Sequence, residues 1–200
     1  MHYTLNMPTN IQTFEFRQNP VIITVNEFTE ESALSFRSSM CDAINSGQKI
    51  IPVVIDSYGG QVYSLMSMIA SINASPVPVA TIVQGKAMSC GAILATFGAD
   101  GLRFVDKDAT LMIHDVSSFA FGKVEELKAD ARESERLNKR VYQMMARNCG
   151  KPEDYFTKII HDKGHADWFL DADEAIEHGL CQHKRIPELK VNVTIDIDIE

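Results

Sequence analysis

The stretch "VATIVQGKAMSCGAIL" (residues 79–94) decides the fold. Its first half is an apolar, β-branched run that favours a buried strand, and its second half is a run of small and apolar residues that favours a helix. The two halves meet at Ser89, whose small neighbours let a strand and a helix approach closely. A strand that turns directly into a helix is typical of α/β proteins.

Strands and helices alternate on both sides of this stretch. The predicted strands cover residues 19–26, 50–56, 79–84, 102–105 and 110–114. The predicted helices cover residues 29–47, 61–74, 90–98 and about 122–148. A further short helix is expected after Asp171, which can cap it in a capping box with Glu174. Short connections between alternating elements predict a mainly parallel sheet, with ligands bound beyond the carboxyl ends of its strands.

Composition and charge restrict the class of protein. The 200 residues suit one domain, and the formal net charge of −8 argues against a nucleic-acid surface, which needs clustered Lys and Arg. No apolar run approaches the ~20 residues that span a bilayer, and the N-terminus does not resemble a signal peptide. The four cysteines have no paired spacing, so we expect free thiols, a reducing compartment and a cytoplasmic protein.

Ser89 has two interpretations. A serine at the start of a helix is commonly an N-cap, and taken alone the stretch favours that role. The segment "AMSCG" (87–91) also resembles the nucleophile elbow of hydrolases, which exposes a serine at a helix N-terminus.

Other residues can complete a catalytic site around Ser89. The Gly59-Gly60 pair follows a predicted buried strand, and one N–H from it together with the Cys90 N–H would form an oxyanion hole. His114 ends a predicted strand and could accept the serine proton, although a structural histidine is the simpler explanation of any single His.

A metal site is not expected. His161 and His165 have the i, i+4 spacing of ligands on a helix, but Gly164 lies between them and no third ligand is evident in the sequence.

Several separated motifs occur in the order and spacing of a known family. They are "DSYGG" (56–60), "GKAMSCG" (85–91), "LMIHD" (111–115), the long charged helix and "DWFLDADEAIEHGL" (167–180). Over about residues 50–181 the chain resembles the proteolytic subunit of the Clp protease. The resemblance implies an α/β fold of the Clp-peptidase/crotonase-like type, a repeated β-β-α superhelix with a mainly parallel sheet and a protruding handle helix at about 122–150.

The resemblance assigns roles to individual residues. It implies that Ser89 is the nucleophile, His114 the general base and Asp167 the carboxylate that orients the imidazole. It also implies that Gly60 and Cys90 donate their backbone N–H groups to the oxyanion, and that neither a metal nor an organic cofactor is required.

Asp115 and Asp162 are rival partners for His114. Asp115 directly follows His114 on an extended chain, so its side chain should point the other way. Asp162 lacks the motif context.

The resemblance also implies domain limits and assembly. Residues 1–185 form one peptidase domain, and residues 186–200 form a tail whose alternating Val and Ile from 191 onwards predict a strand. The partners implied are polypeptide substrates and further copies of the chain, in a heptameric ring or two stacked rings of seven. The apolar positions of the long helix, among them Leu137 and Val141, are expected to face another copy. Neither nucleic acid nor a membrane is expected as a partner.

The chain departs from the family pattern at several places. Asp56 and Tyr58 stand where Asn and Pro are usual, and Asp115-Val116 replaces the usual Gln-Pro. The N-terminal portion does not match the axial-loop region, so an AAA+ unfoldase partner has poor support. The compact form is similar to Clp-like proteases of bacteriophages and prophages, some of which process head proteins.

Three alternative functions stay open. A signal-peptide-peptidase-like enzyme would use a Ser–Lys pair with Lys86 as base. A crotonase-like acyl-CoA enzyme would share the fold and the oxyanion hole without a serine nucleophile. A non-catalytic ring subunit would need no triad at all.

Overall fold

The computed structural model describes residues 20–117 and 122–190. Its strands are β1 (Ile23–Val25), β2 (Ile51–Ser57), β3 (Val79–Met88), β4 (Arg103–Val105), β5 (Thr110–Ile113), β6 (Trp168–Leu170) and β7 (His183–Lys184). Its helices are α1 (Glu30–Asn45), α2 (Val62–Asn73), α3 (Cys90–Ala95), α4 (Val124–Asn148), α5 (Tyr155–Asp162) and α6 (Ala172–Glu177). Within the described ranges, no helix is both long and apolar enough to cross a membrane.

One sheet organises the molecule. The strands follow the order β1-β2-β3-β4-β7, all in parallel pairs, and β5 joins the sheet by pairing with β3. The antiparallel exception is β6, which pairs with β5. The prediction of an α/β fold with a mainly parallel sheet is therefore confirmed.

β3 changes neighbours along its length. Its first half pairs with β4 as far as Val83, and its last three residues pair with β5, from Lys86 opposite Thr110 to Met88 opposite Met112. The strand thus runs four residues beyond the predicted end at residue 84. This extension places Ser89 directly at the end of a paired strand.

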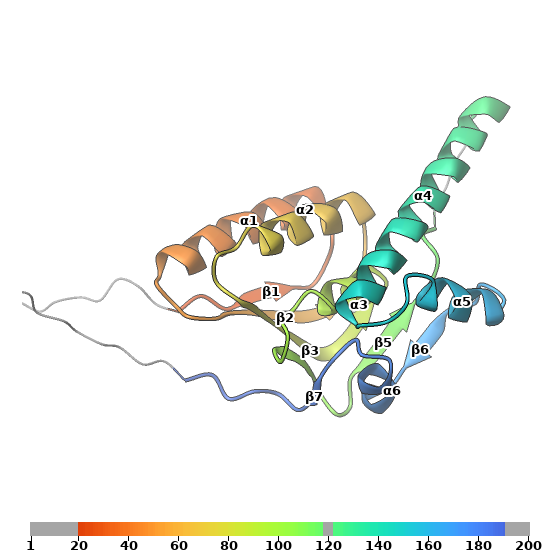
Figure 1. Cartoon of the computed structure of the whole chain (residues 1–200). Coiled ribbons are helices and arrows are strands. Elements are labelled where there is room, and N and C mark those ends of the chain that lie inside the picture. The colour runs from red at the N-terminus through yellow and green to blue at the C-terminus, as the bar shows by residue number, and fades with distance from the viewer. Residues whose placement is uncertain (1–19, 118–121, 191–200) are drawn as a thin grey trace, which may run out of the picture.

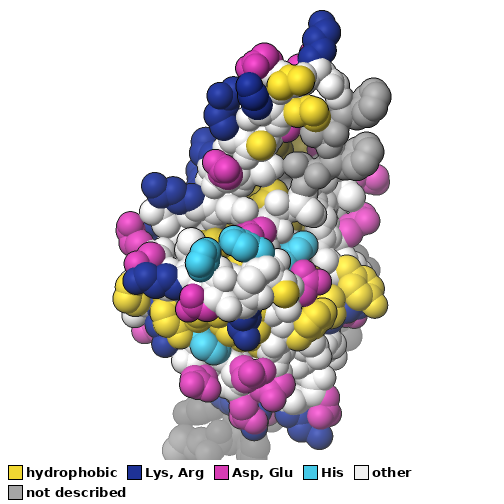
Figure 2. Space-filling view, turned by 90° about the vertical axis from the view of Figure 1, so that its right-hand side faces the viewer, with side chains coloured by type: hydrophobic (Ala, Val, Ile, Leu, Met, Phe, Trp, Pro, Cys, Tyr) yellow, Lys and Arg dark blue, Asp and Glu magenta, His cyan; other side chains and the backbone are white. Residues whose placement is uncertain are grey.

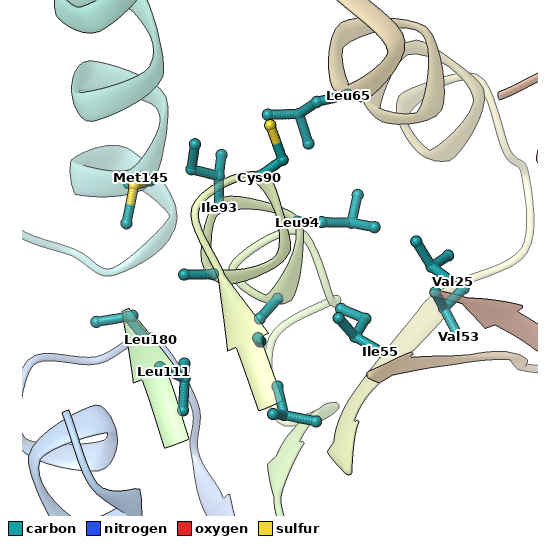
Figure 3. Packing of buried hydrophobic residues seen from close by; sticks show 14 of the residues in the cluster. Val25, Val53, Ile55, Leu65, Cys90, Ile93, Leu94, Leu111, Met145 and Leu180 are labelled. Atoms are coloured by element: carbon teal, nitrogen blue, oxygen red, sulfur yellow. The ribbon is translucent and has the colours of Figure 1, made fainter. Parts of the chain in front are cut away.

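The core lies between the sheet and its helices. The helices α1 and α2 lie side by side over one face of the sheet, and α3 packs between α2 and the strands (Figure 1). Figure 3 shows Leu65 of α2, Cys90 and Leu94 of α3, and Ile55 of β2 converging in this core. Two predicted helix starts are confirmed. Thr29 caps α1, and the capping box of Asp171 with Glu174 begins α6.

The helix α4 has two different halves. Its C-terminal half packs on the domain through Leu137, Val141 and Met145, whereas its N-terminal half projects away from the body of the molecule (Figure 1). The expectation that Leu137 and Val141 face another copy is therefore wrong, since both are buried in their own subunit. Val124 and Leu127, on the projecting half, are large apolar residues of this helix that are exposed.

Other differences from the prediction are local. The sequence reasoning did not predict α5, β6 or β7, and α3 ends at Ala95 rather than at residue 98. The predicted strand of the C-terminal tail lies mostly in residues 191–200, outside the described residues. The described part of that tail, residues 186–190, is not a strand.

Candidate active site

Ser89 lies at the turn between β3 and α3. Its backbone has φ of 54° and ψ of −118°, a left-handed conformation that non-glycine residues rarely adopt and that is typical of strained nucleophile turns. Its N–H donates to the Met112 carbonyl at 2.8 Å, which ties the turn to β5. The hydroxyl does not cap α3. The interpretation of the Ser89 hydroxyl as an N-cap is therefore wrong.

The Ser89 hydroxyl meets His114. His114 directly follows β5, and its Nε2 lies 2.9 Å from Ser89 Oγ, within hydrogen-bond distance. Because β3 and β5 are neighbours in the sheet, two residues 25 positions apart in the chain emerge side by side. A neutral imidazole with a free Nε2 lone pair can accept the hydroxyl proton from this position.

Asp167 lies on the other side of the imidazole. It immediately precedes β6, and β6 pairs with β5 so that Trp168 lies opposite Ile113. The next pair outward brings Asp167 opposite His114, with Asp167 Oδ1 at 3.6 Å from His114 Nδ1. This separation permits an ion pair but is too long for a hydrogen bond. The Asp167 side chain is 54% exposed, against 25% for His114, so water reaches the carboxylate.

The Gly59-Gly60 turn closes the site from the side of β2. Gly59 has φ of 105°, and a Cβ added to it would lie 2.8 Å from Ser89 Cβ. Gly60 has φ of 150°, and a Cβ there would lie 2.5 Å from the Phe28 carbonyl oxygen. Only glycine fits at either position. Gly59 is therefore the glycine that lies against Ser89. The sequence does not predict this contact, because both glycines belong to the same turn and no pattern distinguishes them.

The backbone donors of this turn have distinct surroundings. The Gly59 N–H donates to Ser57 Oγ at 3.0 Å, and the Gln61 N–H donates to the Phe28 carbonyl at 2.7 Å. The Cys90 N–H lies at the first position of α3, where intrahelical acceptors are lacking and the helix dipole favours negative charge. The Cys90 N–H thus lies directly beside Ser89 in the chain, whereas the Gly59 N–H is engaged with Ser57.

Cys90 is a structural thiol. Its side chain is buried and points toward Leu65 (Figure 3), and its sulfur donates to the Gly60 carbonyl at 3.3 Å. Burial raises the pKa of the Cys90 thiol to about 11, so the thiol is protonated at neutral pH. The thiol is therefore a poor nucleophile, although it lies beside Ser89 in the chain.

Lys86 is held away from the role of a base. Its Nζ lies 2.7 Å from Asp56 Oδ1 and 4.5 Å from the centre of the Tyr58 ring. The hydrogen bond to Asp56 raises the pKa of the Lys86 ammonium. A Ser–Lys mechanism needs a neutral amine, hence a lowered pKa, so this ion pair opposes that alternative.

The rival carboxylates and the remaining histidines have other partners. Asp115 accepts hydrogen bonds from Tyr142 and His165. Asp162 lies 3.8 Å from His161.

Histidine side chains gather on the face beneath the projecting end of α4 (Figure 2). In the described part of the chain, no three His, Cys, Asp or Glu side chains are arranged to hold a metal ion.

The model of the Clp protease family matches residues 10–184, which is most of the chain and includes every residue of this site. The chain belongs to the Clp protease family. The resemblance inferred from the motifs is thereby confirmed, and the protein is a peptidase of the hydrolase class. Proteins of this family degrade polypeptides and generally form oligomeric rings.

Proposed function

We propose that this member of the Clp protease family is a serine endopeptidase that uses Ser89, His114 and Asp167. The observation that carries the proposal is the 2.9 Å approach of Ser89 Oγ to His114 Nε2, at a turn whose positive φ exposes the serine. The ion pair of Lys86 with Asp56 leaves the Ser–Lys alternative without an available base.

The proposed reaction follows from this geometry. As Ser89 Oγ bonds to the scissile carbonyl carbon, His114 Nε2 takes the hydroxyl proton, and Asp167 stabilises the resulting imidazolium. The carbonyl oxygen becomes an oxyanion, to which Gly60 and Cys90 donate their N–H groups. His114 then protonates the leaving amine, the C–N bond breaks, and water hydrolyses the acyl-enzyme by the reverse sequence. These steps require neither a metal nor an organic cofactor.

We further propose that the peptidase works inside a chamber of two stacked heptameric rings, with polypeptides as substrates. The projecting half of α4 supports this assembly, because it exposes Val124 and Leu127 away from the body of its own subunit. Val124→Glu with Leu127→Glu should release smaller species in sedimentation velocity while the subunit core stays intact. An unchanged sedimentation coefficient would exclude this half of α4 as the contact.

The cysteines bear on the compartment in which the reaction takes place. The four cysteines are free thiols, which fits a reducing compartment, and we place the enzyme in the cytoplasm. General protein turnover and the processing of a phage head protein both suit such a peptidase. An AAA+ unfoldase is not included, because the N-terminal sequence does not resemble the axial-loop region.

Mass spectrometry of casein and short peptides after incubation with the protein tests the proposed function. We expect new internal cleavage products with the wild type and none with Ser89→Ala. Cleavage of equal rate and pattern by both proteins would show that Ser89 is not the nucleophile. A wild type that cleaves neither substrate would favour a non-catalytic ring subunit.

A further inference from the structure

The position of Asp167 needs an explanation beyond its contact with His114. Within the described residues, the 3.6 Å approach to His114 Nδ1 is the only polar contact of this carboxylate. The last ladder pair before it is Ile113 with Trp168, on a strand of three residues. A long contact and a short strand do not by themselves fix the loop that carries Asp167.

A second contact, just beyond the active site, joins the segment after β5 to the loop before β6. Asp115 Oδ2 lies 2.6 Å from His165 Nδ1. An ionised carboxylate only accepts hydrogen bonds, so the imidazole donates its Nδ1–H. Asp115 is the residue after His114, and His165 lies two residues before Asp167. The pair of His114 with Asp167 therefore sits between the β5–β6 ladder on one side and this hydrogen bond on the other.

Asp115 is itself anchored to the base of α4. Its Oδ1 accepts from the Tyr142 hydroxyl at 3.0 Å, and Tyr142 is buried. Burial, followed by the charge of Asp115, raises the pKa of the Tyr142 hydroxyl far above its usual range, so the hydroxyl stays a donor. The neighbouring Val116 N–H donates to Asn138 Oδ1 at 2.5 Å. The segment after His114 is thus held by two side chains of α4.

His165 adopts a conformation that calls for a reason. Its φ is 60°, and it follows Gly164, whose φ is 66°. Non-glycine residues are uncommon in this region, although histidine is found there more often than most. The side chain is 60% exposed, so packing in the core does not account for the residue. Its N–H donates to the Ile160 carbonyl and its ring packs on His161, but the hydrogen bond to Asp115 is the contact that reaches the segment after β5.

We propose that Asp115 and His165 are positioning residues, whose contact fastens the loop 163–167 to the segment after β5 and so sets where Asp167 lies relative to His114. The inference rests on the proposed function, in which Asp167 orients the catalytic base. It assigns a use to the Asp115 side chain at a position where this chain departs from the family pattern.

Two substitutions at residue 165 test the proposal. His165→Gly removes the donor and tolerates the left-handed backbone, so it isolates the contact from strain. His165→Asn keeps an N–H donor at a similar reach and also tolerates this backbone. We expect kcat to fall about tenfold in His165→Gly with KM changed by less than about twofold, because misplaced catalytic groups lower the rate more than substrate binding. His165→Asn should stay within about twofold of the wild type.

His161→Asn is the matched control. His161 is an exposed histidine at the end of α5 whose ring lies edge to face on the His165 ring, at 5.6 Å between centroids. Its substitution removes that ring contact and leaves the hydrogen bond of His165 to Asp115 in place, so we expect kcat to stay unchanged. Equal kcat in the wild type, His165→Gly and His165→Asn would overturn the inference. An equal loss in His165→Gly and His165→Asn would overturn it too, because the donor would then not matter.

Crystal structures separate this inference from the proposed function. In His165→Gly the carboxylate of Asp167 should move away from His114, and in His165→Asn it should stay in place. An unmoved Asp167 in His165→Gly would overturn the inference whether or not the protein hydrolyses peptides. A wild type no more active than Ser89→Ala, with Asp167 displaced in His165→Gly, would instead refute the proposed function and leave the positioning contact established.

Discussion

The imidazole of His114 has two neighbours that the molecule holds in different ways. On one side, Ser89 and His114 both follow strands that are paired with each other, and the Ser89 N–H bonds directly to β5. On the other side, Asp167 lies in the loop between α5 and β6, at 3.6 Å from the ring. The alignment of serine and histidine is thus built into the sheet, whereas the placement of Asp167 depends on a loop and a few polar contacts.

His114→Ala tests the sheet-held side and should have the largest effect. We expect kcat for a peptide substrate to fall about 10⁴–10⁶-fold, because the serine loses its general base. His161→Ala is the control, since His161 is exposed and its contacts are with Asp162 and the His165 ring rather than with Ser89. A kcat of His114→Ala within tenfold of the wild-type value would show that His114 is not the general base, which contradicts the role given to the sheet-held side.

Asp167→Asn tests the loop-held side and should cost less. We expect kcat to fall about 10²–10³-fold, since an amide cannot stabilise the imidazolium, while water already reaches this half-exposed carboxylate. Steady-state kinetics compares it with Asp162→Asn, which removes another exposed carboxylate of the same region. A loss as large as that of His114→Ala would show that the loop contributes as much as the sheet.

Gly59→Ala asks how tightly the glycine turn fits the nucleophile. The new methyl group would lie 2.8 Å from Ser89 Cβ, so the serine must shift, and we expect kcat to fall about 10–10²-fold. Gly47→Ala is a matched control, because Gly47 also has positive φ but has open space around its added Cβ. Thermal unfolding should show a larger loss of stability in Gly59→Ala, where the clash adds to the strain of the positive φ that both positions share. Equal kcat in both would contradict the close fit at Gly59.

Lys86→Met should have the smallest effect. The ammonium is paired with Asp56, and its raised pKa keeps it charged, so we expect kcat to change by less than about threefold. Measuring kcat of this variant beside His114→Ala ranks the two bases. A larger loss in Lys86→Met than in His114→Ala would reverse the assignment in favour of a Ser–Lys pair.

The sequence predicted the sheet-held side more completely than the loop-held side. The β3–Ser89–α3 turn and the position of His114 follow from local patterns, namely apolar runs, small residues and a turn. The register of β3 with β5 then brings both residues together. The strand, turn and helix around Ser89 and the strand before His114 depend on neighbours in the chain, which a pattern can reveal, and the parallel order of the strands follows from their alternation with helices.

The loop-held side depends on contacts between distant residues. Asp115 meets Tyr142 across 27 positions and His165 across 50 positions, and no local pattern encodes either contact. The helix α5 has only eight residues and ends at Asp162, two residues before the left-handed Gly164, and β6 has three residues, so neither gives a periodic signal. The same limit explains why the sequence predicts a contact between copies for Leu137 and Val141, which instead pack on their own subunit.

Labelling with a fluorophosphonate, followed by peptide mapping, tests the central claim most directly. The reagent bonds covalently to a serine activated by a neighbouring base, and the Cys90 thiol beside it is protonated at neutral pH because its pKa is about 11. The account predicts one adduct per chain, on Ser89, which is lost in Ser89→Ala and greatly slowed in His114→Ala. An adduct on another residue, or labelling of Ser89 that proceeds at the wild-type rate without His114, would contradict it.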